Sequence, residues 1–420
     1  MDKSLLNILK DQVKPALGCT EPAAVAYAVS RAKELLNDHV EKLKITLDTK
    51  LLKNSFSVYI PGTNEKGLIF ASALALVTGQ SKYGLECLKN VDKAASLKAK
   101  EIQNQNIIDI EVKDDEKEIY IDIIAISKDK ESRVIIKDSH TNIVFESLND
   151  KVLLNKDSLR SDGNIESPSK RILDYSFNDL IDFVDNSPIE DLFFIKYGID
   201  MNLAFAENAK ENFNQGIGKL LYENSLDVYS RAKAMTALAS EARMSGSSQS
   251  VMTCAGSGNN GLIAIIPISI IGKEINKSED ELIRSVALSH LVSIYLKARL
   301  GPLSPVCGGG IAGGSGFACG LTYLLGASKD QIALSLNNMI AGITGMICDG
   351  AKIGCAYKLS TSVDSAKDAA LMALSNVEIP CDNGLLGCNP ESTIENLGIL
   401  SNIGMNNTDT SILDIMVNKC

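Results

Sequence analysis

Three segments near the start of the chain carry apolar residues at the spacing of an amphipathic helix: residues 4–14, 21–36 and 67–79. Thr20 directly precedes the second segment and is a suitable N-cap, and Pro22 falls in its first turn, where proline is tolerated. The pattern therefore predicts a helix over each of these segments.

Alternation of apolar and polar residues, which is typical of strands, marks residues 44–48 and 56–60. The same alternation recurs across residues 107–152, where apolar runs are separated by polar turns such as the charged one at 113–117. This region predicts a β-meander with solvated hairpin tips. The polar stretch 155–170 predicts a loop.

Helical patterns resume near Ser176, and from about Asn202 onward the chain consists of helical segments and Gly-rich loops. We expect an α+β fold, in which a mainly helical lobe carries an inserted lobe with antiparallel β-strands. The predicted helical lobe is discontinuous and comprises residues 1–39 and 197–420, while residues 40–196 form the α+β lobe with the β-meander. A length of 420 residues agrees with two lobes, because single cores rarely grow beyond about 300 residues.

Hydrophobic residues make up 45% of the chain and charged residues 22%, as in folded globular proteins. The formal net charge of −10 argues against a protein that coats nucleic acid. The longest apolar run, residues 261–272, is shorter than the roughly 18 residues of a membrane span and predicts a buried helix. The first residues lack the form of a secretory signal. We therefore expect a cytoplasmic protein that acts on neither nucleic acid nor membranes.

Residues 244–272 and 300–328 contain no charged side chain, so both segments are expected to be largely buried. The second segment has eight glycines within residues 301–320. Because glycine is unfavourable inside helices, this density indicates backbone that approaches another group closely.

The ten cysteines of a chain without a secretory signal are better explained as free thiols, metal ligands or catalytic groups than as disulfides. Seven of them lie between residues 254 and 388. The chain has only three histidines and no Cys-x-x-Cys pair, so a metal site would depend on sulfur or oxygen ligands from distant segments. Sulfur-rich sites favour zinc or iron–sulfur clusters.

Cys19 stands in the segment Ala-Leu-Gly-Cys-Thr-Glu-Pro, just before a predicted helix. Unpaired N–H groups at a helix start favour negative charge, so this position can lower the pKa of a thiol and create a thiolate base or nucleophile. A small buried residue at a helix entry is the structural alternative.

Residues 254–261 have the sequence Cys-Ala-Gly-Ser-Gly-Asn-Asn-Gly and precede the apolar helix. Glycines together with Ser257, Asn259 and Asn260 before a helix start can cradle a carboxylate or a phosphate. The segment matches neither a Walker loop nor a dinucleotide-binding pattern. Helix capping without a ligand is the alternative.

Cys307 lies in one Gly-rich segment, and Cys348 and Cys355 lie seven residues apart in another. On an unbroken helix this spacing would separate the last two by about 10 Å along the axis. Gly350 and Gly354 allow a bend that brings them together. With Cys307 they would make three thiolates, and a cluster held by three cysteines instead of four keeps one iron free for a substrate. Buried reduced cysteines in a core of small residues are the alternative.

Three further features carry weaker signals. His290 lies in a helical pattern and is predicted to be a core histidine. Pro61-Gly-Thr63 is either an anion-binding turn or only a turn, and Cys420 is expected to be incidental.

Taken together and in order, these segments resemble the L-cysteine desulfidase family, which is related to the alpha chain of iron–sulfur L-serine dehydratases. The resemblance rests on Gly18-Cys-Thr-Glu-Pro22, Pro61-Gly-Thr63, Gly256-Ser-Gly-Asn259, Leu288-Ser-His290, Leu303-Ser-x-x-Cys307, Gly345-Met-Ile-Cys-Asp-Gly350 and Cys355-Ala-x-Lys358. It implies an oxygen-sensitive [4Fe-4S] cluster held by Cys307, Cys348 and Cys355, and Cys19 as the proton acceptor in an α,β-elimination. The chain departs from the family pattern at Asn260, where glutamine is common, and at Cys254, so Cys254 is left out of the ligand set.

The resemblance implies an iron–sulfur lyase of amino-acid catabolism that converts L-cysteine to pyruvate, ammonia and hydrogen sulfide. We assign substrate binding to Thr20, Glu21, Ser257, Gly258, Asn259 and Lys358. The alternatives are an L-serine dehydratase on the same scaffold, a pyridoxal-phosphate lyase with Lys352 or Lys358 as Schiff base, and a non-catalytic amino-acid sensor. The expected partners are the small amino-acid substrate and, as the default for soluble enzymes, a second copy in a homodimer.

Overall fold

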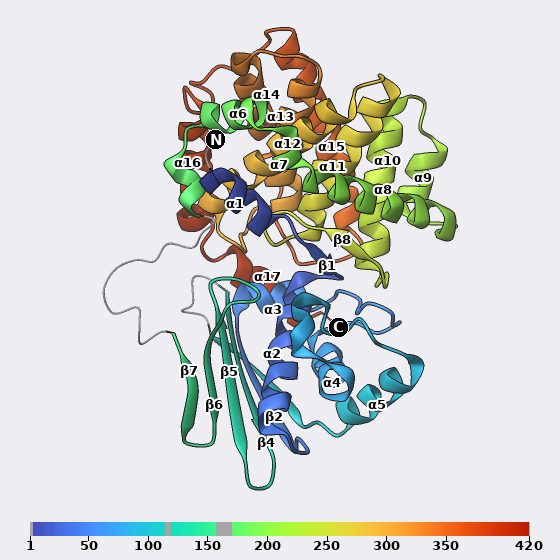
Figure 1. Cartoon of the computed structure of the whole chain (residues 1–420), viewed down its shortest axis with the longest axis vertical. Helices are drawn as coiled ribbons and strands as arrows, with labels where there is room; N and C mark the ends of the chain where they lie inside the picture. The colour runs from blue at the N-terminus through green and yellow to red at the C-terminus, as the bar shows by residue number, and fades with distance from the viewer. Residues whose placement is uncertain (1–2, 114–118, 157–169, 420) are drawn as a thin grey trace.

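The computed structural model describes residues 3–113, 119–156 and 170–419 and shows two lobes (Figure 1). One lobe consists almost entirely of helices, and the other combines a six-stranded sheet with helices. The predicted α+β class is confirmed. Within the described ranges, no helix is long and apolar enough to cross a membrane.

The helical lobe is built around α11, Gly258–Glu274, which carries the long apolar run. Helices α8, α10, α12 and α13 pack around it, so the absence of charge along most of α11 follows from burial on every side. The elements of this lobe are α1 (Lys3–Gln12), η3 (Lys170–Asp174), α6 (Phe177–Asn186), α7 (Ile189–Leu192), α8 (Phe194–Asn212), α9 (Ile217–Glu223), α10 (Val228–Met244), α11, α12 (Glu279–Leu300), η4 (Gly308–Gly313), α13 (Gly314–Leu324), α14 (Lys329–Ile343), α15 (Cys355–Leu374), α16 (Pro390–Ile399) and η5 (Leu400–Gly404).

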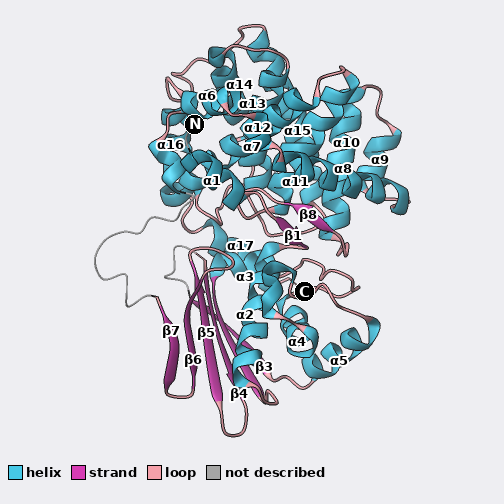
Figure 2. Cartoon of the chain, viewed as in Figure 1, coloured by secondary structure: helices cyan, strands magenta, loops and turns pink. Residues whose placement is uncertain are grey.

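The sheet of the second lobe has the strand order β3-β2-β4-β5-β6-β7 (Figure 2). Strands β4 to β7 form the predicted antiparallel meander. Strands β2 and β3 are parallel, and a crossover of three α-helices and the short helix η1 connects them. The elements are α2 (Thr20–Leu36), β2 (Lys42–Asp48), α3 (Thr49–Ser55), α4 (Leu68–Thr78), η1 (Ser81–Glu86), α5 (Lys93–Asn104), β3 (Ile108–Lys113), β4 (Tyr120–Ile126), β5 (Glu131–Lys137), β6 (Ile143–Leu148) and β7 (Lys151–Asn155).

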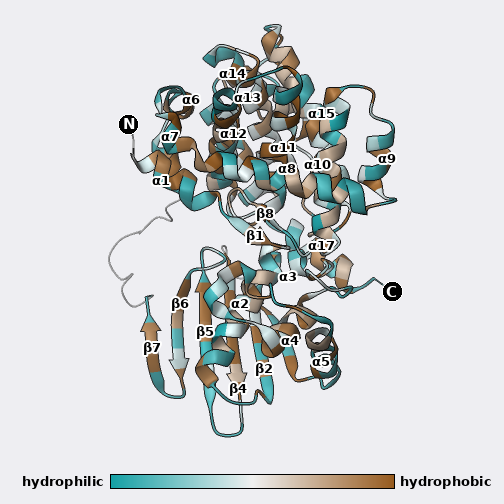
Figure 3. Cartoon of the chain, turned by 45° about the vertical axis from the view of Figure 1, so that its right-hand side comes forward, coloured by the Kyte–Doolittle hydropathy of each residue, from teal (hydrophilic) through white to brown (hydrophobic). Residues whose placement is uncertain are grey.

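Helix α2 lies on one face of this sheet, where its small apolar residues allow a close approach. Ala24, Ala28 and Ala32 are fully buried against alternate residues of the strands. Two polar contacts hold the same packing: the hydroxyl of Ser132 donates to the carbonyl of Ala32 at 2.7 Å, and a half-buried Arg31 pairs with Glu146. Figure 3 shows hydrophobic colouring on α4 and on parts of the strands, and hydrophilic colouring at the β4–β5 turn.

Two local predictions differ from the structure, and two others lie mostly outside the described residues. Residues 56–60 are not a strand. They follow directly after α3, and only Tyr59 among them forms an isolated bridge. Asp48 caps α3 by accepting from the N–H of Leu51 at 2.9 Å. The N-cap of α2 is Cys19, one residue earlier than predicted. The charged turn at 113–117 and the polar loop fall mostly on 114–118 and 157–169, outside the described residues.

The predicted domain boundaries at residues 39 and 196 stay a prediction. The chain passes from one apolar core to the other at different positions. Helix α2 belongs to the core of the sheet, and α6 packs against α12 in the helical core. Both helices therefore contribute their apolar face to a different lobe from the one that the sequence pattern indicated.

A short antiparallel pair, β1 (Pro15–Leu17) with β8 (Ser250–Met252), was not predicted. Each strand has only three residues, too short for a period-two pattern to be recognised. This pair places the loop before Cys19 beside the loop that leads into α11.

The last helix, α17 (Thr408–Val417), packs on α3 of the sheet lobe. Lys53 and Asp409 are both almost fully buried and form an ion pair of 2.5 Å, and the same ammonium donates to the carbonyl of Cys348 at 2.7 Å. The ion pair thus joins the C-terminal helix, the sheet lobe and the segment of Cys348.

We expect Asp409→Asn to lower the free energy of unfolding by about 3–5 kcal/mol, because the buried Lys53 charge loses its counter-ion. Asp414→Asn, at an exposed position of the same helix, should change it by less than about 0.5 kcal/mol. Urea unfolding followed by circular dichroism measures both. Equal stability of the two variants would contradict a structural role for the buried pair.

Candidate active site

Cys19 lies at the junction of the lobes, between β1 and the first turn of α2. Gly18 before it has a φ of +68° and packs so tightly on Pro61 that a Cβ there would lie 2.3 Å from the proline ring. The Cys19 side chain is buried and belongs to a small apolar cluster with Val58 and Met244. Cys355 packs against the same cluster.

Glu21 accepts three hydrogen bonds that hold its carboxylate over Cys19. The Cys19 thiol donates to Oε2 at 2.8 Å, the Thr20 hydroxyl donates to the same oxygen at 3.1 Å, and Asn54 donates to Oε1 at 3.0 Å. Burial alone would raise the pKa of Glu21, but the charge on His140 and the hydrogen bond from Cys19 lower it below its ordinary value. Glu21 is therefore an anionic acceptor for the thiol.

The pKa of Cys19 is raised well above its ordinary value, first by burial and then by the charge of Glu21, with Arg243 opposing. The expected lowering of this pKa by the helix start is therefore wrong for this structure. The helix-end effect is worth only about 0.3–1 kcal/mol at exposed sites, which burial outweighs.

Arg243, at the end of α10, connects the Cys19 loop to the loop before α11. Its Nη2 donates to the carbonyl of Gly18 at 2.7 Å, and its Nη1 donates to Oδ1 of Asn259 at 3.2 Å. Gly258 makes room for the guanidinium, because a Cβ at this residue would lie 2.3 Å from Nε. The predicted anion cradle thus contains a buried cation from a different helix.

The side chains of the predicted cradle are largely committed to the protein itself. Ser257 caps α11 by accepting from the N–H of Asn260 at 3.4 Å, and Asn259 accepts from Arg243 and from the hydroxyl of Ser240. The first-turn N–H groups still make this helix start suitable for an anion.

Backbone pairing brings the segments of Cys307 and Cys348 side by side. Val306 forms an antiparallel bridge with Ile347, and the N–H of Cys348 donates to the carbonyl of Pro305 at 2.6 Å. Gly350 then takes a φ of +90°, which turns the chain before α15 begins at Cys355. The predicted bend at glycine is present, and the three cysteines from distant segments lie close together.

The electrostatic influence of the three thiols on one another agrees with this arrangement. Burial raises the pKa of Cys307 to about 12, and the charges of Cys348 and Cys355 add to the increase. The N–H of Gly310 donates to the Cys307 sulfur at 3.3 Å. In the described part of the chain, no set of three or more His, Cys, Asp or Glu residues converges on a single metal ion.

Lys358, a predicted substrate-binding residue, lies beside the three cysteines, but its ammonium is already paired within the protein. Its ammonium donates to the carbonyl of Ile347 at 2.7 Å and pairs with Asp349, and Lys352 pairs with the same carboxylate. Burial would raise the pKa of Asp349, but the two lysines lower it to about 2.

The sequence interpretation missed two residues that the structure brings to the site, His140 and Lys297. His140, in the β5–β6 turn, packs over Gly256, and its pKa is lowered by burial and by Lys297, with Glu21 opposing. Burial also lowers the pKa of Lys297 to about 8, while Cys348 and Glu21 oppose the shift. Nothing near either residue in the sequence marked it, because α12 carries other charged residues and His140 lies in an unremarkable polar turn.

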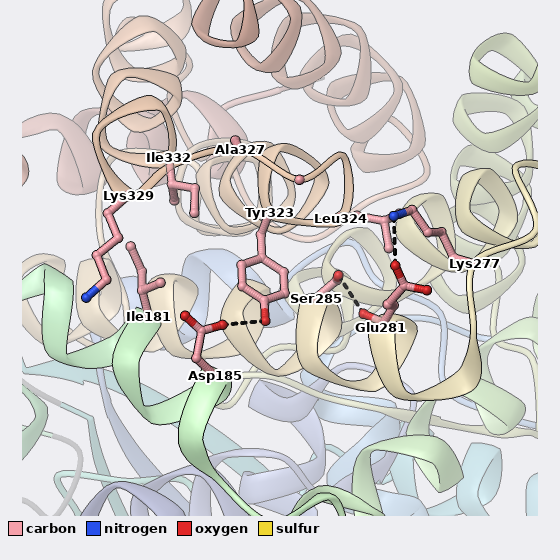
Figure 4. Close-up of a pocket in the computed structure, with 11 residues that line it drawn as sticks. Ile181, Asp185, Lys277, Glu281, Ser285, Tyr323, Leu324, Ala327, Lys329 and Ile332 are labelled. Atoms are coloured by element: carbon pink, nitrogen blue, oxygen red, sulfur yellow. Dashed lines mark hydrogen bonds and ion pairs between the residues drawn. The ribbon is translucent and has the colours of Figure 1, made fainter.

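Other candidates lie apart from this centre. His290 is fully buried in the helical core, which lowers its pKa to about 3, so its predicted place in the core is confirmed. Neither of its ring nitrogens has a hydrogen-bond partner among the described residues. Cys254, Cys87 and Cys319 are also buried, while Cys381 and Cys388 are exposed. The helical lobe has a separate cavity of about 300 Å³. Figure 4 shows its lining, where Tyr323 donates to Asp185 and Lys277 pairs with Glu281. No predicted site residue lines it.

The model of the serine dehydratase alpha chain family matches residues 82–414, well over half of the chain. The chain belongs to this family. Serine dehydratase alpha chains are generally iron–sulfur lyases, so membership supports a lyase-like enzyme of amino-acid catabolism. The match includes the three clustered cysteines and the start of α11, whereas Cys19 lies before it.

Relatives with the name UPF0597 protein cover nearly the whole chain. A UPF0597 protein of Clostridium tetani is 47% identical over 417 residues, which cover 99% of this chain and 98% of the relative. Another, from Caldanaerobacter subterraneus, is 48% identical with the same coverage. A third, from Clostridium perfringens, is 36% identical and covers 100% of this chain and 99% of its own. These names state no reaction.

We expect Gly258→Ala to destabilise the protein by about 1–3 kcal/mol, because the new Cβ would displace the buried Arg243 guanidinium. Gly342→Ala, in α14, meets no atom within 4 Å and should instead stabilise the protein by about 0.5–1 kcal/mol. Thermal unfolding distinguishes the two. A gain of stability in both variants would contradict the close approach at Gly258.

We expect Glu21→Gln to lower the pKa of Cys19, because the carboxylate that disfavours the thiolate is removed. More thiolate at pH 8 should make alkylation of Cys19 by iodoacetamide several-fold faster. Peptide mass spectrometry measures the rate, with the exposed Cys381 and Cys388 as internal controls. An unchanged rate at Cys19 would refute control by Glu21.

Proposed function

We propose that the protein is an iron–sulfur-dependent lyase that eliminates hydrogen sulfide from L-cysteine. The observation that carries the proposal is the position of the Cys19 thiol, in one apolar cluster with Cys355, which is one of the three cysteines of the trio. A hydrogen-bonded thiol beside a sulfur-rich metal site combines a proton acceptor with a site for a leaving group.

Cys307, Cys348 and Cys355 would hold a [4Fe-4S] cluster. The donor set fits, because the three residues are soft sulfur ligands and glycines flank each of their segments. When bound, the cluster would supply a Lewis-acidic iron with an open coordination position. The nearby cation of Lys297 suits an anionic group in this location.

Cys19 would remove the α-proton of the substrate. Its own thiol must be deprotonated first, and the hydrogen bond that this thiol donates to Glu21 at 2.8 Å holds the sulfur in place. Thr20 and Asn54 keep the carboxylate in place by their hydrogen bonds. Elimination of the α-proton and the β-thiolate leaves aminoacrylate, and hydrolysis of this product yields pyruvate and ammonia.

The start of α11 would bind the substrate carboxylate. The N–H groups of Gly258 and Asn259 lie in its first turn, where backbone donors favour an anion, and Ser257 orders this turn as the N-cap. Arg243 keeps the turn next to Cys19 by bonding to both loops. Lys358 would shape the other side of the site through its pair with Asp349.

L-Serine is the second candidate substrate, and family membership favours it. The two amino acids differ only in the β-atom, sulfur or oxygen, and use the same proton acceptor. A homodimer and a cytoplasmic location complete the proposal.

A pyridoxal-phosphate lyase and a non-catalytic amino-acid sensor have less support from the geometry. A Schiff-base lysine must be available as a free amine, yet Lys352 and Lys358 both pair with Asp349. An amino-acid sensor does not require three cysteines around one centre.

We expect anaerobically reconstituted protein to form pyruvate and sulfide from L-cysteine. Cys307→Ala, Cys348→Ala and Cys355→Ala should each lose iron, whereas Cys19→Ala should keep iron and lose activity by about 10²–10⁴-fold. The exposed Cys381→Ala is the matched control and should retain both. Iron and acid-labile sulfide analysis with product assays measures these effects.

Two results would overturn the proposal. One is equal iron content in all five variants, which would remove the ligand roles. The other is iron-replete wild type that forms pyruvate from neither L-cysteine nor L-serine, which would remove the reaction.

A further inference from the structure

Cys381 and Cys388 are a pair of exposed thiols that the proposed function does not use. Both lie in the connection between α15 and α16, residues 375–389. Their sulfur atoms are 3.0 Å apart, and one thiol donates a hydrogen bond to the other. Every other described cysteine is buried or half-buried. This pair is therefore the one place in the described part of the chain where two exposed thiols meet.

The chain is held in place before it reaches Cys381. Asn338 of α14 donates from Nδ2 to the carbonyl of Val377 at 3.0 Å, and its Oδ1 accepts from the N–H of Ile379 at 2.9 Å. Because one carboxamide makes both bonds, it sets the direction as well as the position of the segment that leads to Cys381.

The chain is also held in place just before Cys388. Asn396 of α16 donates to the carbonyl of Leu385 at 2.9 Å. The hydroxyl of Thr393, in the same helix, accepts from the N–H of Gly387 at 2.9 Å. Contacts with α16 thus position the segment that ends at Cys388.

A turn between these two anchors reverses the chain. The N–H of Asn383 donates to the carbonyl of Pro380 at 3.0 Å, and Gly384 takes a φ of +61°, a conformation that favours glycine. The contact between the two sulfurs is thus a result of backbone geometry that the neighbouring helices fix. Two thiols held in this way meet each other at a high effective concentration.

The spacing of the sulfurs favours a disulfide over a metal ion. Two thiolates on one zinc ion lie about 3.8 Å apart, because each Zn–S bond is about 2.3 Å long and the angle is tetrahedral. The sulfurs of Cys381 and Cys388 are closer than that, and a covalent S–S bond of about 2.0 Å needs a further approach of only about 1 Å. Within the described ranges, no third His, Cys, Asp or Glu joins them to complete a metal site.

We infer that Cys381 and Cys388 form a reversible redox site whose substrates are small-molecule disulfides. The site lies on the surface, where a small disulfide can reach either sulfur. This activity is separate from the proposed lyase reaction and does not depend on it, since neither residue belongs to the three cysteines of the proposed cluster site.

The reaction consists of two exchange steps. The thiolate of one cysteine attacks a sulfur of the small disulfide, which forms a mixed disulfide and expels one small thiolate. The thiolate of the other cysteine then attacks the protein sulfur of the mixed disulfide and expels the second small thiolate. One protein disulfide replaces the small disulfide. The two electrons pass from the pair to the small disulfide, and the two thiol protons pass to the released thiolates.

The test treats anaerobic, iron-replete protein with oxidised glutathione, blocks the remaining thiols with iodoacetamide and maps every cysteine by peptide mass spectrometry. We expect wild type to form an internal disulfide between Cys381 and Cys388, seen as the loss of two hydrogen masses, and dithiothreitol to restore both thiols. The buried Cys319 is the internal control and should stay a free thiol.

Single variants distinguish a reacting pair from two independent thiols. Cys381→Ser and Cys388→Ser each keep one exposed cysteine but lack the thiol that completes the exchange. We expect glutathione to stay bound to the remaining cysteine, at a level about tenfold or more above that on wild type. Circular dichroism and iron content establish that the variants are folded.

Three results would overturn the inference. The first is bound glutathione on wild type at the same level as on the single variants, which would make the two thiols independent. The second is oxidation of neither cysteine. The third is one zinc ion per chain that protects both thiols and is lost from both single variants, which would make the pair a metal site. None of these readouts uses pyruvate or sulfide formation, so the inference and the proposed function fail independently.

Discussion

One buried guanidinium, that of Arg243, holds the two parts of the candidate active site together. It donates to the carbonyl before Cys19 and to the side chain of Asn259 at the start of α11. These groups are more than 220 residues apart in the sequence, so no local interaction could align them. Because Arg243 is planar and makes several directed hydrogen bonds, it sets orientation as well as distance. Gly258 is required beside it, since any side chain there would occupy the place of the guanidinium.

The arrangement of Cys307, Cys348 and Cys355 also depends on backbone segments that approach each other closely. Pairing of Val306 with Ile347 sets Cys307 next to Cys348, and Gly350 turns the chain toward Cys355. Burial keeps the thiol of Cys307 protonated at neutral pH, since its pKa is about 12. Binding of a metal cluster would therefore release protons, and the protein provides for the resulting negative charge with Lys297 and Lys358 nearby.

Both lobes contribute to the chemistry. The helical lobe supplies the three cysteines, Lys297 and the start of α11, and the sheet lobe supplies Glu21, Asn54 and His140. The buried pair of Lys53 and Asp409 links the sheet lobe to the C-terminal helix and, through a carbonyl, to Cys348. A change in how the lobes meet would thus alter the proposed proton acceptor, the proposed substrate contacts and the proposed sulfur ligands together.

Features that depend on near neighbours could be predicted from the amino-acid sequence. The helices, the meander, the buried helix α11 and the glycine bend between Cys348 and Cys355 follow from periodicity and backbone freedom. Features that depend on distant groups required the folded chain. The parallel pairing of β2 with β3 needs contacts across three helices, and the raised pKa of Cys19 comes from burial and from Glu21. His140 and Lys297 became visible only when folding placed them beside the same loop, because burial and charge are properties of surroundings that a linear pattern does not contain.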